Sequence, residues 1–294
     1  MLDPKIYTLL KVAETGNYTQ AGKELNITQP AVSQHIRALE REFDIKIFER
    51  LGNQLILTKE GESVVACARS MISLYNNLRT SLKDEAAGMM SLKIGVTHTV
   101  ESNRLSEVFA KYASTGKGIN IKLLTGTQAK LIQRLKNFEL DFALIDGRIN
   151  EPGLKNMQLD TDSLILVTSI DHPLAKKNTV SIDDIKHEKL ILRLPDSSTA
   201  NLFTASLESK NLSLRDFNVI LEVDNVATIK DLVRHQYGVS ILPKSACMDD
   251  IRKKRLIGLP IDNLSMVREI NFVYSENFRH TDLLQEFVNL YNEI

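Results

Sequence analysis

The first residues in this sequence that suggest a chemistry are polar side chains spaced four apart near position 30. Gln29 and Ser33 are four residues apart, as are Ser33 and Arg37, so the three share one face of a helix. A glutamine amide can bridge N6 and N7 of adenine, a serine hydroxyl can bond several bases, and an arginine can reach guanine or a phosphate. This face could therefore read DNA.

The surrounding residues favour a helix that presents this face. Thr28 is a good N-cap, and Pro30 falls in the first turn, where its missing N–H costs little. Val32, Ile36 and Leu39 form the opposite, apolar face. A recognition helix enters the major groove by its N-terminal end. That end displays Thr28, Gln29, Pro30, Ser33, Gln34 and Arg37.

Charge alone does not decide whether this face binds nucleic acid. The chain has 37 Lys and Arg against 37 Asp and Glu, and residues 1–58 are balanced as well. Affinity for phosphate depends on where the charges point, and Arg37, Lys46 and Arg50 could cluster. On charge and pattern, a plain three-helix bundle with a polar third helix stays open.

A second set of polar residues follows predicted strands further along the chain. In α/β domains ligands bind at the carboxyl ends of strands, and the free N–H groups of helix N-termini there favour anions. The predicted ligand residues are Thr97, His98, Thr99, Thr127, Ser197, Ser198, Thr199 and Asn225. Each of them alone could equally be a structural helix cap.

Other chemistries find little support. We see no nucleophile with its base and no phosphate loop, and we expect no metal and no cofactor. His98 has no second His or Cys at ligand spacing. Cys67 and Cys247 form neither a disulfide framework nor a zinc motif. A redox switch between them would require proximity and a lowered thiol pKa.

Composition and hydropathy bear on where the protein works. The chain has 294 residues, 43% hydrophobic and 25% charged, which is typical of about two globular domains. Residues 1–11 lack a basic start followed by an apolar run, and no stretch approaches the apolar length that spans a membrane. We therefore expect a cytoplasmic protein without a membrane partner. An exported solute-binding protein, or an α/β enzyme with a helical extension, is the weaker interpretation.

Three short helices and a small wing must position the first polar face. Apolar residues at helical spacing predict a first helix that ends at Gly16, and Asn17 caps a second. Only residues 26–28 separate the second helix from the third, which is typical of a helix-turn-helix. Residues 45–57 then predict two short strands about a turn at 51–54.

A long helix is predicted from a Thr58 N-cap to about residue 87. Its apolar residues are spaced by four and three in turn, which is a heptad seam. A helix with a single apolar stripe needs a partner, and a second copy of itself is the simplest one. The predicted dimer seam is Val64, Ala68, Met71, Tyr75, Leu78 and Leu82.

From residue 92 strands alternate with helices, which predicts α/β layers with mostly parallel sheets. The predicted strands are 92–97, 119–124, 141–145, 164–169, 190–192, 219–223, 239–242 and 270–274. The roughly two hundred residues of this part are enough for two small lobes.

Together these motifs resemble LysR-type transcriptional regulators. The matching residues are Ala13–Ala21, Leu25, Thr28–Ile36, Leu39-Glu40, Phe48-Glu49-Arg50, and Leu57-Thr58 with Gly61. Gly22 and Asp44 depart from the pattern, since the family usually has alanine and glycine there. The resemblance implies that residues 18–37, beginning with Tyr18 and Thr19, form the DNA-binding element. It also implies that Arg50 contacts backbone phosphate.

The C-terminal landmarks Asp171–Leu174 and Tyr237–Pro243 also resemble this family, whose C-terminal domain resembles periplasmic binding proteins. That implies two α/β lobes, two crossover strands and a ligand between the lobes. The fold expected is α/β: an N-terminal all-α winged helix-turn-helix and long linker helix, then the two-lobed α/β domain. The expected boundaries are 1–58 for the winged helix-turn-helix, 59–88 for the linker helix, 89–161 with 268–294 for lobe I, and 162–267 for lobe II.

The resemblance implies a sequence-specific DNA-binding transcriptional regulator, controlled by a small molecule bound between the lobes. Its partners are a double-stranded DNA operator, that effector and a second copy of the chain. A homodimer is expected, with a homotetramer as the larger assembly, and the choice between dimer and tetramer is left open. RNA polymerase is left open as a partner.

The segment Thr97–Thr99 resembles the branch of the family that responds to sulfate and acetylserine. It implies a small polar or anionic effector, or a zwitterion, although Glu101 would repel a pure anion. The effector, the operator and the sign of regulation are left open.

Overall fold

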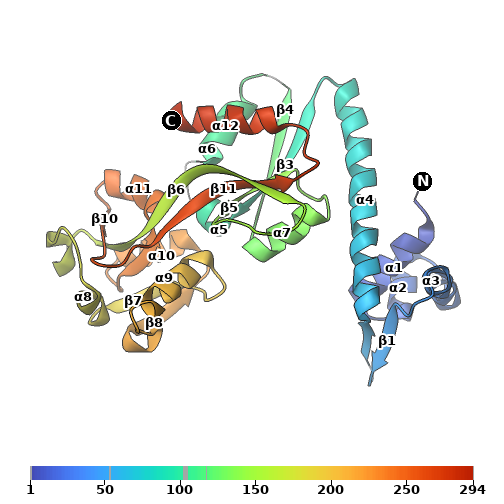
Figure 1. The fold of residues 1–294 in the computed structure, drawn as a ribbon, viewed down its shortest axis with the longest axis horizontal. Helices are drawn as coiled ribbons and strands as arrows, with labels where there is room; N and C mark the ends of the chain where they lie inside the picture. Colours follow the sequence, from blue (N-terminus) through green and yellow to red (C-terminus); the bar gives the residue numbers. More distant parts are fainter. Residues whose placement is uncertain (1, 53, 102–104, 117, 294) are drawn as a thin grey trace. The chain divides into compact units, whose positions relative to one another are not determined.

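The computed structural model describes residues 2–52, 54–101, 105–116 and 118–293 (Figure 1). It contains two compact units. The first comprises residues 1–88 and 136–139, and the second comprises 89–135 and 140–294. Within the described ranges, no helix is both long enough and apolar enough to cross a membrane.

The first unit begins with three helices, each of which starts at a side-chain cap. They are α1 (Pro4–Thr15), α2 (Tyr18–Leu25) and α3 (Gln29–Phe43). Asp3, Asn17 and Thr28 accept hydrogen bonds from backbone N–H groups of the first turns, which otherwise have no partner in the helix. The short connection between α2 and α3 confirms the predicted helix-turn-helix.

A wing and a long helix complete this unit. The antiparallel strands are β1 (Phe48–Leu51) and β2 (Gln54–Leu57), with Phe48 opposite Leu57. Gly52 of the predicted turn has a positive φ, and Asn53 lies outside the described residues. Helix α4 (Lys59–Ala86) begins at the predicted Thr58 cap.

The core of the first unit explains how α3 is held. Val32, Ile36 and Leu39 of α3 are buried, and Val65 and Ala68 of α4 join the same cluster. At Gly61, a Cβ atom would lie 2.1 Å from the carbonyl oxygen of Ile47, so the start of α4 can approach the wing only with glycine.

The large sheet of the second unit is mixed, and the expectation of mostly parallel sheets was wrong. Its strands, in sequence order, are β3 (Met90–Thr97), β4 (Ile119–Gly126), β5 (Phe142–Asp146), β6 (Leu154–Ser169), β9 (Ser240–Pro243), β10 (Leu256–Leu259) and β11 (Val267–Ser275). The order is β10-β6-β11-β5-β3-β4, with β9 also paired to β6. Among the described residues of this sheet, β3 alone pairs in parallel, with β4 and β5.

The mixed character has a specific cause. The long strands β6 and β11 lie side by side and run in opposite directions, and β9 and β10 pair antiparallel with β6. Strand β6 starts earlier than predicted, and β10 was not predicted.

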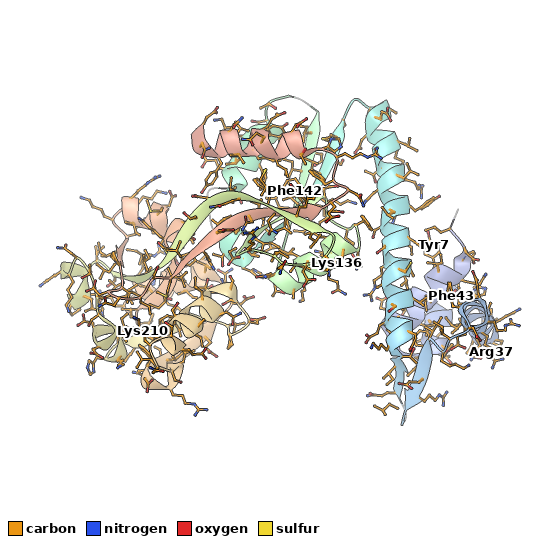
Figure 2. All side chains as sticks on the ribbon, viewed as in Figure 1. Tyr7, Arg37, Phe43, Lys136, Phe142 and Lys210 are labelled. Atoms are coloured by element: carbon orange, nitrogen blue, oxygen red, sulfur yellow. The ribbon has the colours of Figure 1, made fainter. Side chains whose placement is uncertain are left out.

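One end of this sheet carries an aromatic core. The helices there are α5 (His98–Glu101), α6 (Leu105–Ala113), α7 (Gln128–Lys136) and α12 (Thr281–Glu293). Phe142 of β5, which is labelled in Figure 2, is part of this core. Its ring centroid lies 5.7 Å from that of Phe272 and 5.8 Å from that of Phe287.

The other end carries separate apolar clusters, formed by residues 164–266. Strands β7 (Lys189–Arg193) and β8 (Asn218–Val223) are parallel, with Arg193 opposite Val223. The surrounding helices are η1 (Pro173–Lys176), α8 (Ile182–Lys186), α9 (Ser198–Glu208), η2 (Leu214–Asp216), α10 (Val226–Arg234) and α11 (Lys244–Arg252). We call the two ends lobe I and lobe II.

Candidate functional site

The N-terminal turn of α3 presents the polar face found in the sequence. Gln29, Pro30, Gln34 and Arg37 are exposed, and Ser33 is half-buried. Arg37 lies at the surface of α3 in Figure 2. Since the opposite side of the helix is buried in the core, this face is the one left for a partner.

Contacts with α1, α2 and the wing position this face. Thr8 Oγ1 of α1 lies 2.8 Å from His35 Nδ1 of α3. The ring of Tyr18 is half-buried and meets that of Phe48 edge-on at 6.2 Å. Burial is the largest cause of the raised pKa of Tyr18. Thr19 is exposed beside it, with its N–H bonded to the side chain of Asn17.

The balanced charge of this unit hides an uneven distribution. Several basic side chains are neutralised locally by acidic neighbours. The pairs are Lys5–Asp3, Lys11–Glu14, Lys11–Glu24 and Lys46–Glu40. Arg37 and Arg50 are exposed and make no ion pair with the described residues. Of the three residues expected to cluster, Lys46 is therefore paired, while Arg37 and Arg50 are available for phosphate.

The predicted seam of α4 divides into two parts. Ala68 is buried in the core of its own unit and Val64 is half-buried against it, so this end of the seam is already covered. Tyr75 is half-buried, 6.0 Å from the Arg79 guanidinium. The large apolar residues left exposed are Met71, Leu74, Leu78 and Leu82. The available stripe is therefore shorter than predicted, and it includes Leu74, which was not in the prediction.

A cavity of about 310 Å³ lies between the lobes of the second unit, at the ends of their parallel strands. The predicted residues that line it are Thr97, His98, Thr99, Thr127, Ser197 and Ser198. Thr199 is buried and lines a smaller, more apolar cavity instead. Asn225 caps α10 by accepting from Thr228 N, and it does not line the first cavity.

Asp146 is the centre of a buried polar cluster that sequence reasoning missed. Its carboxylate accepts hydrogen bonds from Thr97 of lobe I and Ser198 of lobe II, and from Arg268 Nη1 at 2.6 Å. The same Nη1 lies 3.0 Å from Ser198 Oγ. A buried carboxylate requires hydrogen bonds or a cation that replace its contacts with water. The Asp146 carboxylate receives them from both lobes and from Arg268 of strand β11.

Arg193 is the second residue missed, and it lines the cavity itself. Only 3% of it is exposed. Its Nη2 donates to Asp224 at 3.1 Å, while Nε and Nη1 are buried and have no hydrogen-bond partner among the residues that the structure describes. Burial is the largest cause of the lowered pKa of Arg193.

Both missed residues had a signal in the sequence. Asp146 directly follows the apolar run 142–145, and Arg193 interrupts the apolar run 190–194. A charge at the end of a buried strand is uncommon unless it is paired or functional.

Metal and thiol chemistry have little basis in the described residues. Among them, no group of three or more His, Cys, Asp or Glu is arranged to hold a metal ion. Cys67 is exposed on α4, whereas burial raises the pKa of Cys247 to about 12.

Comparisons with known proteins agree with this architecture. The family described as "Bacterial regulatory helix-turn-helix protein, lysR family" matches residues 5–62, and "LysR substrate binding domain" matches residues 87–293. The HTH-type transcriptional regulator CysL of Bacillus subtilis (strain 168) is 25% identical over 284 residues, which covers 96% of this chain and 94% of CysL. The transcriptional activator CmpR of Synechocystis is 23% identical over 282 residues, which covers 95% and 90%.

Two solved structures share the fold. Full-length CbnR in complex with its target DNA has a TM-score of 0.69 at 18% identity, covering 100% of this chain and 99% of CbnR. The effector-binding domain of QuiR in complex with shikimate has a TM-score of 0.56 at 21% identity, covering 68% of this chain and 94% of QuiR.

Proposed function

Because the chain belongs to the LysR family of transcriptional regulators, we propose that α3 reads operator DNA and that a small polar molecule in the inter-lobe cavity sets its activity. The chain is a DNA-binding regulator with an effector-binding domain, and its family is not enzymatic. The observation that carries the DNA proposal is the exposed, capped N-terminal turn of α3. In this proposal the protein works in the cytoplasm, where it meets its DNA.

In this proposal the residues of the face have different tasks. Gln29 and Ser33, with Gln34 and Thr28 beside them, contact base edges in the major groove. Arg37 and Arg50, together with Tyr18, Thr19 and Pro30 at the rim, contact sugar and phosphate. Phosphate contacts set position and base contacts set sequence preference. The absence of ion pairs at the two arginines, within the described part of the chain, supports their role.

Two copies of the chain complete the proposed DNA-binding unit. The exposed stripe Met71, Leu74, Leu78 and Leu82 supports pairing of α4 with a second α4. A dimer carries two α3 helices, which suits an operator of two half-sites about one helical turn apart. A homotetramer is the larger assembly proposed. CmpR is named a transcriptional activator. If this chain also activates transcription, RNA polymerase is a further partner in the proposal.

Effector control follows from the position of the cavity. Its walls come from both lobes, so a bound molecule favours the lobe arrangement in which both walls contact it. A ligand shifts such an equilibrium only through a difference in affinity between the two states. A small polar molecule suits the threonine and serine side chains that line the cavity.

A mobility-shift assay tests both parts. The full chain is titrated onto the DNA upstream of its own gene, with and without a library of small metabolites. We expect specific binding that one class of metabolite alters. Thr99→Val keeps the shape of this buried cavity residue and removes its hydroxyl, so the response should disappear while basal DNA binding persists. Binding that no variant of α3 weakens would contradict the proposal.

A further inference from the structure

We infer that the inter-lobe cavity binds a small zwitterion, with its carboxylate on Arg193 and its ammonium group on oxygen atoms of the cavity wall, those of Thr97, Ser198, Asp196 and Asp224. The inference rests on the proposed effector role of this cavity and names the chemical class that it accepts. The cavity of about 310 Å³ is at the lower end of the range for small-molecule sites, roughly 300–1,000 Å³, so the ligand is small.

The buried guanidinium of Arg193 favours an anionic group on the ligand. Its guanidinium is buried at the end of β7, and Asp224 engages only Nη2. Nε and Nη1 have no acceptor among the described residues. A buried donor without a partner is costly, and a carboxylate offers two acceptor oxygens with the geometry that arginine recognises. Burial also lowers the pKa of Arg193, and a neighbouring negative charge opposes that effect.

Two of the hydroxyl groups that line the cavity require a hydrogen-bond donor on the ligand instead. Thr97 and Ser198 both give their hydroxyl hydrogens to Asp146, so toward the cavity they can only accept. A carboxylate or sulfate oxygen placed against these two oxygens would find no hydrogen. An ammonium group, which has three donors, matches them.

The charges on the wall distinguish a zwitterion from a simple anion. Asp196 and Asp224 both line the cavity beside the single cationic side chain of Arg193. The Asp224 side chain is 57% exposed and only partly used by Arg193. An anion without a positive group would bring further negative charge toward two carboxylates. A zwitterion places its ammonium group there and its carboxylate on the guanidinium.

The test uses the full chain and isothermal titration with named probes. These are the twenty common L-amino acids, then, for each that binds, its decarboxylated amine and its deaminated acid, with sodium sulfate as a plain anion. We expect an amino acid to bind at least about tenfold more tightly than either truncated probe. Arg193→Gln should abolish that binding, whereas Arg255→Gln, at an exposed arginine outside the cavity, should not change it. Circular dichroism checks that both variants are folded.

Asp224→Asn provides a second variant that should fold, because it keeps an acceptor for Arg193 on a half-exposed side chain. It should weaken the amino acid about tenfold and strengthen the deaminated acid. Three results would overturn the inference: a deaminated acid or sulfate that binds as well as any amino acid, amino-acid binding insensitive to Arg193→Gln, or no binding by any amino acid. If the DNA complex still responds to other metabolites through Thr99, only the ligand class is wrong and the effector role stands.

Discussion

Gln29 donates a hydrogen bond from its side-chain Nε2 to Oγ of Ser33, 2.9 Å away and one turn further along α3. The bond uses one amide hydrogen, and Oε1 and the second amide hydrogen remain available to a base. An acceptor beside a donor is the pattern that pairs with N6 and N7 of adenine. Ser33 therefore orients Gln29 before DNA arrives, which reduces the side-chain entropy lost on binding.

The first prediction concerns sequence preference. Gln29→Ala should weaken operator binding by about 1–3 kcal/mol and relax preference at one base step, because it removes the base contact. Ser33→Ala should weaken operator binding and relax the base preference in the same way but by less, since it removes the hydroxyl that orients Gln29. Competition mobility shifts against operators with single base changes measure both quantities.

Two variants serve as controls for this prediction. Arg50→Ala should weaken all sequences about equally, because a phosphate contact carries no base information. Glu42→Ala, exposed at the far end of α3, should leave binding unchanged. Unchanged operator affinity in Gln29→Ala would mean that another register of α3 faces the bases.

The second prediction concerns the α4 stripe. Met71 and Leu78 are 46% and 57% exposed and lie seven residues apart on one face. Met71→Glu with Leu78→Glu would bury like charges between paired helices, so sedimentation should show loss of this contact. Arg69→Glu with Asn76→Glu has the same spacing on another face and should leave the assembly intact. A double stripe variant that stays dimeric and binds a two-half-site operator would rule out this seam.

The first unit could be predicted from sequence because its helix starts carry local signals. Part of the second unit could not be predicted, because some of its strands form only by pairing with distant segments. The caps Asn17, Thr28 and Thr58 act within a few residues, and each marked a helix start. Strand β10 and the first half of β6 depend on partners far along the chain. In β6, polar residues between 154 and 163 mask the pattern, and only pairing with β11 reveals a strand.

The cavity residues show the same division between local features, which the sequence predicts, and long-range contacts, which it does not. Thr97 and Ser198 were found because strand ends and helix caps are local features. The role of Arg193 depends on its burial and on the Asp224 carboxylate, which directly follows β8. A linear pattern encodes neither of these. The sequence predicted Thr97 and Ser198 as ligand residues but not the direction of their hydrogen bonds, which the Asp146 carboxylate sets by accepting from both hydroxyls.

The third prediction concerns the join between the wing and α4. An alanine at Gly61 would place Cβ 2.1 Å from the carbonyl oxygen of Ile47, so backbone must move. Overpacking costs about 1–3 kcal/mol, and the gain in helix propensity of about 1 kcal/mol offsets only part of it. Calorimetry of Gly61→Ala should show a lower Tm for the first unit. Ser63→Ala, at an exposed position two residues further along α4, should leave the Tm near that of the wild type. If Gly61→Ala also left the Tm unchanged, that would contradict the close approach of α4 to Ile47.

The fourth prediction concerns thiol reactivity. Burial raises the pKa of Cys247 to about 12, so it has almost no thiolate at pH 8, whereas Cys67 is exposed. A thiol reagent should label one cysteine in the native chain and two in denaturant, and Cys67→Ser should abolish native labelling. Because the folded pKa exceeds the unfolded value of about 8.5, Cys247 stabilises the fold below that pH. That contribution is lost as the pH rises toward 12. Two labels in the native chain would show that Cys247 is accessible.

The last prediction concerns the charge pair beneath the cavity. The Arg268 and Asp146 side chains are 6% and 1% exposed, with Nη1 and Oδ2 2.6 Å apart. Arg268→Met leaves a buried carboxylate held only by Thr97 and Ser198, and removal of one partner of a buried pair costs about 3–5 kcal/mol. Urea unfolding should show that loss, whereas Arg255→Met at an exposed arginine should change stability by less than about 0.5 kcal/mol. Adding Asp146→Asn to Arg268→Met should restore part of the stability, because the amide is neutral and still accepts from Thr97. If the double variant is no more stable than Arg268→Met alone, the unpaired charge of Asp146 is not the cause. The loss then comes from the packing of the Arg268 side chain or from its ion pair with the buried Asp162, 3.9 Å away.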